Sequence, residues 1–270
     1  MHNIKHSKEF SLFVIKKFMQ DDCFYRASAL TFTTLLAIVP IMYVTLFLLS
    51  LTSYTQHFVG PIEAFILKNF IPSTSYLIQT YLQRFAEQAS KVPSGDLLFL
   101  VVTVFFMMLT IEQAFNVIWE TKSARENLKA FFLYFAIIAF GPIILGVSLA
   151  LSSFFFSLPL FHKVPIIPYY AFTILPFIFS LLGLTFLYVI VPNCPVSFSH
   201  GLAGGVFAAF AFEIAKRGFV FYLSQFNGYT RLYGAFAVIP VFFFWVYLCW
   251  LIILIGAEIS YACSKPPSGR

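Results

Sequence analysis

Charged residues are scarce in this chain. They make up 10% of its 270 residues, whereas hydrophobic residues make up 60% and aromatic residues 20%. A soluble domain usually carries about 25% charged residues, because its surface faces water. So few charges exclude a large solvated surface. We therefore expect most of the chain to lie in lipid, as an all-α polytopic membrane protein.

The motifs that mark catalytic and metal sites are also missing. The four cysteines are isolated, without a CxxC pair, and the five histidines are scattered. The sequence contains no Walker loop, no dinucleotide-binding glycine pattern, no zinc-binding His/Glu motif and no GxSxG turn. We therefore predict no catalytic residue, no metal site and no cofactor, and we do not expect an enzyme.

Hydrophobic runs, in contrast, are abundant. A membrane-spanning helix needs about 20 mostly apolar residues, and six runs meet this requirement. They are residues 29–51, 97–119, 130–156, 166–191, 201–223 and 235–262. The sequence therefore predicts six transmembrane helices in a single membrane domain over residues 29–262.

Two amphipathic segments flank the first predicted span. Residues 52–96 are too polar to cross a membrane, and apolar residues recur at helical spacing within 75–89, so we expect an extramembrane helical cap there. Residues 10–18 are expected to lie along the inner membrane surface, within a cytoplasmic N-terminal segment over residues 1–28. Residues 263–270 form the predicted cytoplasmic tail.

Basic residues are concentrated before the first hydrophobic run. Lys5, Lys8, Lys16, Lys17 and Arg26 all lie there, where an anionic cytoplasmic leaflet attracts them. The remaining loops keep this bias when the N-terminus is placed inside, so we expect both termini in the cytoplasm. The net charge of +6 alone would suggest nucleic acid as a partner, but the position of these basic residues argues for a membrane surface. We therefore expect membrane lipids, and not nucleic acid, as partners.

The fifth predicted span carries a patch of charge. Glu213 precedes Lys216 and Arg217 at the i,i+3 and i,i+4 spacings that allow pairing on one helix. A charge at the centre of a membrane costs about 2.5–3.5 kcal/mol, so each one requires a partner or a purpose. Two interpretations stay open: a self-neutralised structural pair, or part of a polar cavity for an anionic or amphiphilic substrate.

Small residues precede this patch on the same helix. Gly201, Gly205 and Ala209 repeat every four residues and so form one face with almost no side chain. Such a face lets a neighbouring helix approach closely. We therefore predict that this face is a helix-packing surface.

Further polar residues lie in or beside other predicted spans. Glu112 and Asn116 are one turn apart in the second span, and Glu258 lies near the cytoplasmic end of the sixth. Arg26, directly before the first span, is a candidate partner for either glutamate. A structural ion-pair network and a proton relay are both open interpretations of this set.

Ordered sequence stretches from about residue 20 to residue 263 carry a family resemblance. They are Arg26-Ala-Ser-Ala-Leu-Thr-Phe with Pro40, Phe115-Asn-Val-Ile-Trp119, Val191-Pro-Asn, Gly201-Leu-Ala-Gly-Gly205, Tyr233-Gly-Ala-Phe with Ile239-Pro-Val-Phe, and Leu254-Ile-Gly-Ala-Glu258-Ile. Together they resemble the YihY/BrkB family of bacterial inner-membrane proteins. The resemblance implies a bacterial inner-membrane location and a role in moving lipids or lipopolysaccharide precursors, or in serum resistance.

The same family carries an old ribonuclease label. Metal-dependent RNA cleavage needs clustered carboxylates or histidines, whereas the 11 acidic residues here are dispersed. Our first hypothesis is therefore a transporter or flippase-like protein for an amphiphilic or anionic envelope molecule. The alternative is a non-transporting structural membrane protein of the cell envelope, in which the intramembrane charges only hold helices together. An enzyme is the third hypothesis.

Overall fold

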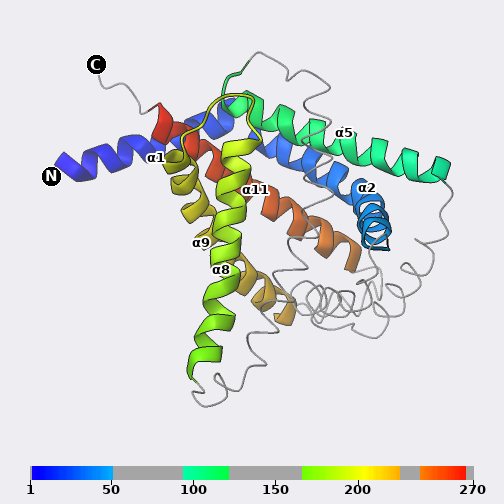
Figure 1. Ribbon diagram of the computed structural model, residues 1–270. Coiled ribbons are helices and arrows are strands. Elements are labelled where there is room, and N and C mark those ends of the chain that lie inside the picture. Colours follow the sequence, from blue (N-terminus) through cyan, green and yellow to red (C-terminus); the bar gives the residue numbers. More distant parts are fainter. Residues whose placement is uncertain (1, 51–93, 122–165, 226–237, 266–270) are drawn as a thin grey trace. The chain divides into compact units, whose positions relative to one another are not determined.

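The structure is a computed structural model that describes residues 2–50, 94–121, 166–225 and 238–265. Over these residues the chain is helical, without a strand. The helices, labelled in Figure 1, are α1 (His2–Gln20), α2 (Cys23–Ser50), α5 (Ser94–Ile118), α8 (Ile166–Ile190), α9 (Phe198–Gln225) and α11 (Val238–Ser264). The prediction of an all-helical protein is confirmed for this part of the chain.

Four stretches of these helices are long and apolar enough to cross a membrane. They are Cys23–Ile41, Leu98–Ile118, Phe198–Tyr222 and Ile239–Ser264, and a shorter apolar stretch, Phe177–Ile190, lies in α8. The predicted span 130–156 lies outside the described residues, as does nearly all of the predicted cap over 52–96. The prediction of a membrane protein is therefore supported, while the count of six spans stays a prediction.

Helix α2 begins earlier than the hydrophobic run suggests. Its first residue is Cys23, and Arg26 therefore lies within its first turn rather than before it. A two-residue turn, Asp21 and Asp22, separates it from α1. Pro40 lies inside α2, and the helix continues beyond it to Ser50. The amphipathic segment predicted over 10–18 forms part of α1.

The chain divides into two compact units, and each is described by itself. The first comprises Met1–Leu35, Leu109–Ala124 and Thr173–Arg270, and the second comprises Leu36–Met108 and Arg125–Phe172. The described part of the second unit consists of segments of α2, α5 and α8. All candidate site residues lie in the first unit.

Helices α9 and α11 pack so closely that glycine is required between them. A Cβ atom on Gly204 would meet the backbone carbonyl oxygen of Gly256, and a Cβ on Gly256 would meet the hydroxyl of Tyr188. A backbone carbonyl has no rotamer with which to move aside. Gly204 therefore fixes the distance between α9 and α11, and Gly256 leaves room for the Tyr188 side chain of α8.

The predicted small face of α9 lies against α8. A Cβ on Gly201 would come within 2.6 Å of a Val189 methyl carbon, and one on Gly205 would meet the Thr185 hydroxyl. Ala209, the third member of that face, is 1% exposed. Helix α9 thus uses one small face toward α8 and another, through Gly204, toward α11.

Contacts of aromatic side chains connect α8 with α11 and α5, and α11 with α2. Tyr188 of α8 is fully buried, and its hydroxyl donates a hydrogen bond to the Ile253 carbonyl of α11 at 3.0 Å. Its ring lies 6.2 Å from that of Phe115 at the end of α5. The indole nitrogen of Trp250 donates to the Thr34 hydroxyl of α2 at 3.0 Å. Partly buried hydrogen bonds of this kind fix helix rotation as well as distance.

Candidate functional site

In the charge patch on α9, one of the two predicted pairings is present. The Lys216 ammonium donates to a Glu213 carboxylate oxygen at 2.5 Å, and the two side chains are 42% and 32% exposed. Arg217 is exposed. The patch therefore combines a neutralised ion pair with one further cation, within a stretch of α9 that is long and apolar enough to cross a membrane.

Arg217 lies on an exposed apolar face of α9. Phe210, Ile214 and Phe221 precede and follow it at i−7, i−3 and i+4, which places all four on one side of the helix. The exposed fractions of the three apolar side chains are 60%, 69% and 67%. A single guanidinium within an apolar stripe matches the two ends of an amphiphile, an anionic head and a hydrocarbon body.

The polar pair on α5 is buried and contacts the segment before α9. Glu112 is 5% exposed and accepts a hydrogen bond from the Asn116 amide nitrogen at 3.4 Å. The Asn116 amide oxygen accepts from the backbone N–H of Asn193 at 2.8 Å. Asn116 therefore connects the end of α5 to the link between α8 and α9.

A second polar cluster, which we call the α1–α11 junction, consists of Lys17, Asp21, Glu120, Tyr261 and Lys265. The Lys17 ammonium is 2.8 Å from Asp21 Oδ2 and 3.3 Å from Glu120 Oε1, and it lies 4.4 Å from the centre of the Tyr261 ring. Lys265 approaches Glu120 Oε2 at 3.6 Å. Figure 1 shows α1 crossing the C-terminal end of α11 at this place.

Lys17, at the centre of this junction, is nearly inaccessible to solvent. Its side chain is 8% exposed, whereas those of Glu120 and Lys265 are 56% and 63% exposed. Burial disfavours the ammonium of Lys17, but the hydrogen bond and charge of Asp21, with the nearby carboxylates of Glu258 and Glu120, outweigh it and raise the pKa of Lys17. Lys17 therefore stays charged over the whole physiological range.

Glu120 is held in the junction by an uncommon backbone conformation. Its φ is 54°, in the left-handed region that non-glycine residues seldom adopt. The Thr121 N–H bonds to the Asn116 carbonyl and the Glu120 N–H to the Val117 carbonyl, the Schellman arrangement that ends a helix. A hydrogen bond with the Tyr261 hydroxyl, aided by the charges of Lys17 and Lys265, lowers the pKa of the Glu120 carboxyl. Glutamate thus occupies a position that usually favours glycine, and it presents its carboxylate to both lysines.

Glu258 lies beside this junction, on α11. Its side chain is 0% exposed, and its Oε1 accepts a hydrogen bond from the Cys23 thiol at 3.5 Å. Arg26, the partner suggested by sequence, donates through Nε to the Asp21 backbone carbonyl at 2.8 Å. Because α2 begins at Cys23, Arg26 lies next to the end of α1, where the last carbonyl groups have no hydrogen-bond donor within the helix.

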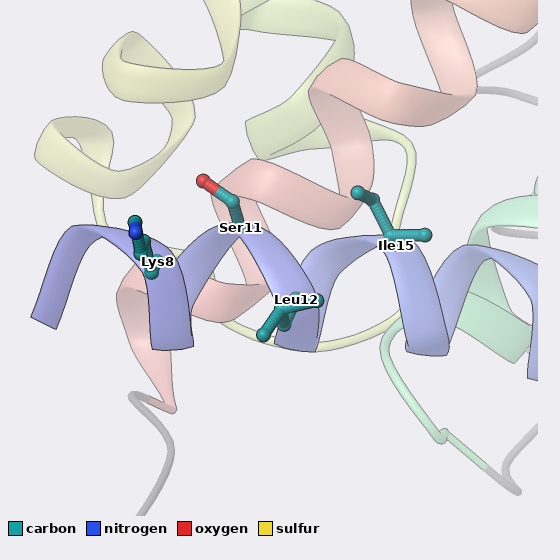
Figure 2. Close-up of a pocket in the computed structure, with 4 residues that line it drawn as sticks. All are labelled: Lys8, Ser11, Leu12 and Ile15. Carbon is teal, nitrogen blue, oxygen red and sulfur yellow. The ribbon is translucent and has the colours of Figure 1, made fainter. Parts of the chain in front are cut away.

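The outer side of α1 carries apolar and basic residues together. A hollow of about 290 Å³ is lined by Lys8, Ser11, Leu12 and Ile15, which Figure 2 shows along the helix. Leu12 and Ile15 are 65% and 61% exposed, and Met19 continues the stripe at 58%. Apolar side chains beside lysines on one helix are typical of segments that lie in a membrane interface.

The seven polar residues predicted from sequence thus occupy three places. Glu213, Lys216 and Arg217 form the α9 patch; Glu112 and Asn116 form the α5 pair; Glu258 and Arg26 lie near the α1–α11 junction. Sequence reasoning missed the junction itself. The signal that could have found it is a set of charges bordering hydrophobic runs: Lys17 and Asp21 before the first, Glu120 after the second and Lys265 after the last.

Comparison with known proteins assigns this chain to a family. The family model described as "Virulence factor BrkB" matches residues 14–268. The chain belongs to the BrkB family. The span of the match includes the α9 patch, the α5 pair and the α1–α11 junction, and the resemblance noted from the sequence is confirmed.

Curated relatives carry membrane-protein names. The chain is 50% identical over 260 residues to the UPF0761 membrane protein lpg0643 of Legionella pneumophila, covering 94% of this chain and 62% of the relative. It is 42% identical over 254 residues to the UPF0761 membrane protein PA0951 of Pseudomonas aeruginosa, covering 93% and 62%. The chain thus spans about 62% of the length of these relatives. No solved structure matches.

Proposed function

We propose that this BrkB-family chain binds and moves an anionic amphiphile of the bacterial envelope, a phospholipid or a lipopolysaccharide precursor. The observation that carries the proposal is the exposed Arg217 in the apolar stripe of Phe210, Ile214 and Phe221. A charged side chain that faces lipid tails costs about 2.5–3.5 kcal/mol. An anionic headgroup beside Arg217 offsets that cost, and the neighbouring apolar side chains suit its hydrocarbon body.

The neighbouring ion pair supports the same chemistry. Glu213 neutralises Lys216, so the patch keeps one net positive charge, which favours an anion over a zwitterion. Both paired side chains remain partly exposed, and the Lys216 ammonium keeps donors for a headgroup oxygen. A binding and transport role, and not an enzymatic one, fits a site made of a cation beside apolar surface.

The alternative, a non-transporting structural protein, rests on the same pair. In this alternative, the i,i+3 contact between Glu213 and Lys216 neutralises two charges within the helix and has no further role. In that case the charge-swapped double variant, Glu213→Lys with Lys216→Glu, keeps both stability and any lipid response. In the transport proposal the swapped variant folds but loses its response to anionic lipid, because the ammonium has moved one turn along α9.

Lipid binding is tested by thermal unfolding of the full chain in detergent. We expect phosphatidylglycerol to raise the apparent Tm of the wild type more than phosphatidylethanolamine does, since a ligand of the folded state stabilises it by about 2.7 kcal/mol at one hundred times Kd. Arg217→Gln should lose this difference. Gly218→Ala is the matched control, because no described atom lies within 4 Å of a Cβ at this position. Equal shifts with both lipids would contradict the proposal.

We also propose six spans with both termini in the cytoplasm of the bacterial inner membrane. Four chain segments lie together and so belong on one side of the membrane: the end of α1, the end of α5, the start of α9 and the end of α11. They are joined by the contacts of Glu120 with Lys17 and Lys265 and of Asn116 with Asn193. Such a gathering fits a membrane crossing between α5 and α8, and so supports the proposal of a span over 130–156. The lysines of α1 favour the cytoplasmic leaflet on that side.

Site-directed labelling tests this topology. In a variant whose four cysteines are replaced by serine, a single cysteine is placed at Gln225 or at Lys265. We expect a membrane-impermeant maleimide to label Gln225→Cys in intact spheroplasts and to label Lys265→Cys only after permeabilisation. Labelling of both positions from the same side would refute the arrangement.

A further inference from the structure

The side chains of α1 fall into three sectors around the helix, which we call packed, apolar and polar. Residues of the packed sector are buried, and those of the other two are exposed. In that order the sectors contain Val14, Lys17 and Phe18; Leu12, Ile15 and Met19; and Glu9, Lys16 and Gln20. Successive residues lie about 100° apart on a helix, so the apolar sector stands between the packed and the polar sector. A helix that meets protein, lipid and water in turn has this order of side chains.

The apolar sector lies beside a segment that can cross a membrane. Helix α1 ends at Gln20, and after a two-residue turn α2 begins at Cys23, which is also the first residue of a candidate span. Phe24 and Tyr25, in the first turn of α2, are exposed, and aromatic residues are enriched where lipid meets water. Lys17 holds the packed sector in the α1–α11 junction. The apolar sector is therefore kept on the outside of the protein, near the level at which α2 enters the membrane.

Two lysines accompany the apolar sector. Lys8 lies one turn before Leu12 and Lys16 one turn after it, and both lysines are exposed. Lys8 also lines the hollow that Figure 2 shows along the helix. The stem of a lysine covers apolar surface while its ammonium reaches toward polar groups. Glu9 is exposed too, but it lies about a quarter turn from the centre of the apolar sector. Positive charge therefore borders the apolar surface.

We propose that the apolar sector of α1 inserts into the adjacent lipid leaflet and that Lys8 and Lys16 bind the phosphate groups of anionic phospholipids there. The apolar side chains lie among the acyl chains, the two ammonium groups lie at the level of the phosphates, and the polar sector faces water. Anionic lipids are favoured over zwitterionic ones, because each lysine near an anionic surface strengthens the attraction by about a factor of five. This surface is separate from the α9 patch, and the inference does not depend on the proposed function.

Quenching by brominated lipids measures which lipids surround α1 in the full chain. Leu12→Cys, at an exposed position one turn from each lysine, carries a bimane fluorophore. Cys194, Cys249 and Cys263 are replaced by serine, whereas the fully buried Cys23 stays in place. The protein is reconstituted in phosphatidylcholine vesicles with the same minor share of either acyl-brominated phosphatidylglycerol or acyl-brominated phosphatidylcholine. We expect the brominated phosphatidylglycerol to quench the fluorophore more strongly.

Substitution of the lysines tests the origin of this excess quenching. Lys8→Gln with Lys16→Gln should lower the excess by about fivefold or more. Lys8→Arg with Lys16→Arg is the matched control, which keeps both positive charges and should retain the excess. All four changes are at exposed positions of α1, so both double variants should fold. Arg217→Gln should also retain the excess, so this inference and the proposed function can fail separately.

Two results would overturn the proposal. Equal quenching by the two brominated lipids would show that α1 does not select anionic lipid. Absence of quenching by either lipid would show that the apolar sector does not meet acyl chains and that water, another protein or a second copy of this chain covers it instead.

Discussion

Gly204→Val is expected to prevent recovery of folded protein. The Cβ atom alone would meet the carbonyl oxygen of Gly256 and come within 3.0 Å of the Ser260 Cβ on α11. A backbone carbonyl in a helix cannot turn away, so α9 and α11 must separate along their contact. Overpacking usually costs about 1–3 kcal/mol, and we expect a larger loss here because backbone and not side chain is displaced.

The measurement is thermal unfolding combined with size-exclusion chromatography in detergent. Gly218→Ala provides the control on the same helix, since no described atom lies within 4 Å of the added Cβ. Alanine favours a helix over glycine by about 0.8–1.0 kcal/mol, so this variant should match or exceed the apparent Tm of the wild type. A monodisperse Gly204→Val protein with the wild-type Tm would show that α9 and α11 do not meet through Gly204.

Lys17→Met should be the second most damaging substitution. It removes the one buried ammonium of the α1–α11 junction and leaves Asp21 without its 2.8 Å partner. Breaking a buried pair by removing one member costs about 3–5 kcal/mol, because the other charge stays behind uncompensated. We therefore expect a large fall in apparent Tm, with α1 becoming accessible to limited proteolysis.

Lys265→Met is the matched comparison for that variant. Both lysines contact Glu120, but the Lys265 side chain is 63% exposed and that of Lys17 is 8% exposed. Exposed ion pairs contribute about 0–1 kcal/mol. Equal effects of the two substitutions would mean that burial of Lys17 does not determine the stability of the junction.

Features of the fold that depend on local sequence could be predicted. Hydrophobic runs predicted the helices α2, α5, α9 and α11, because a span is recognised by about 20 consecutive apolar residues. The contact of Glu213 with Lys216 follows from helical spacing in the same way. Boundaries were less accurate: α2 begins at Cys23, because polar residues next to a span can extend the helix beyond the hydrophobic run.

The α1–α11 junction could not be predicted by the same reasoning. Lys17 and Glu120 are separated by 103 residues, and only the tertiary structure brings them together. Glu120 also adopts a conformation, with φ of 54°, that is uncommon for its residue type. The close approach at Gly204 was missed for a related reason. Its face lies one position away from the predicted stripe of Gly201 and Gly205, and the sequence does not reveal that α9 packs on two sides.

Movement of an anionic lipid by the reconstituted chain is the most direct test of the central claim. The full chain is placed in vesicles of phosphatidylethanolamine and phosphatidylglycerol that contain a trace of fluorescent phosphatidylglycerol, and dithionite is added outside. Our account predicts that the wild type exposes inner-leaflet fluorophore to dithionite, that Arg217→Gln slows this exposure, and that Gly218→Ala does not. Inner-leaflet fluorescence that remains protected with folded wild-type protein would contradict the account.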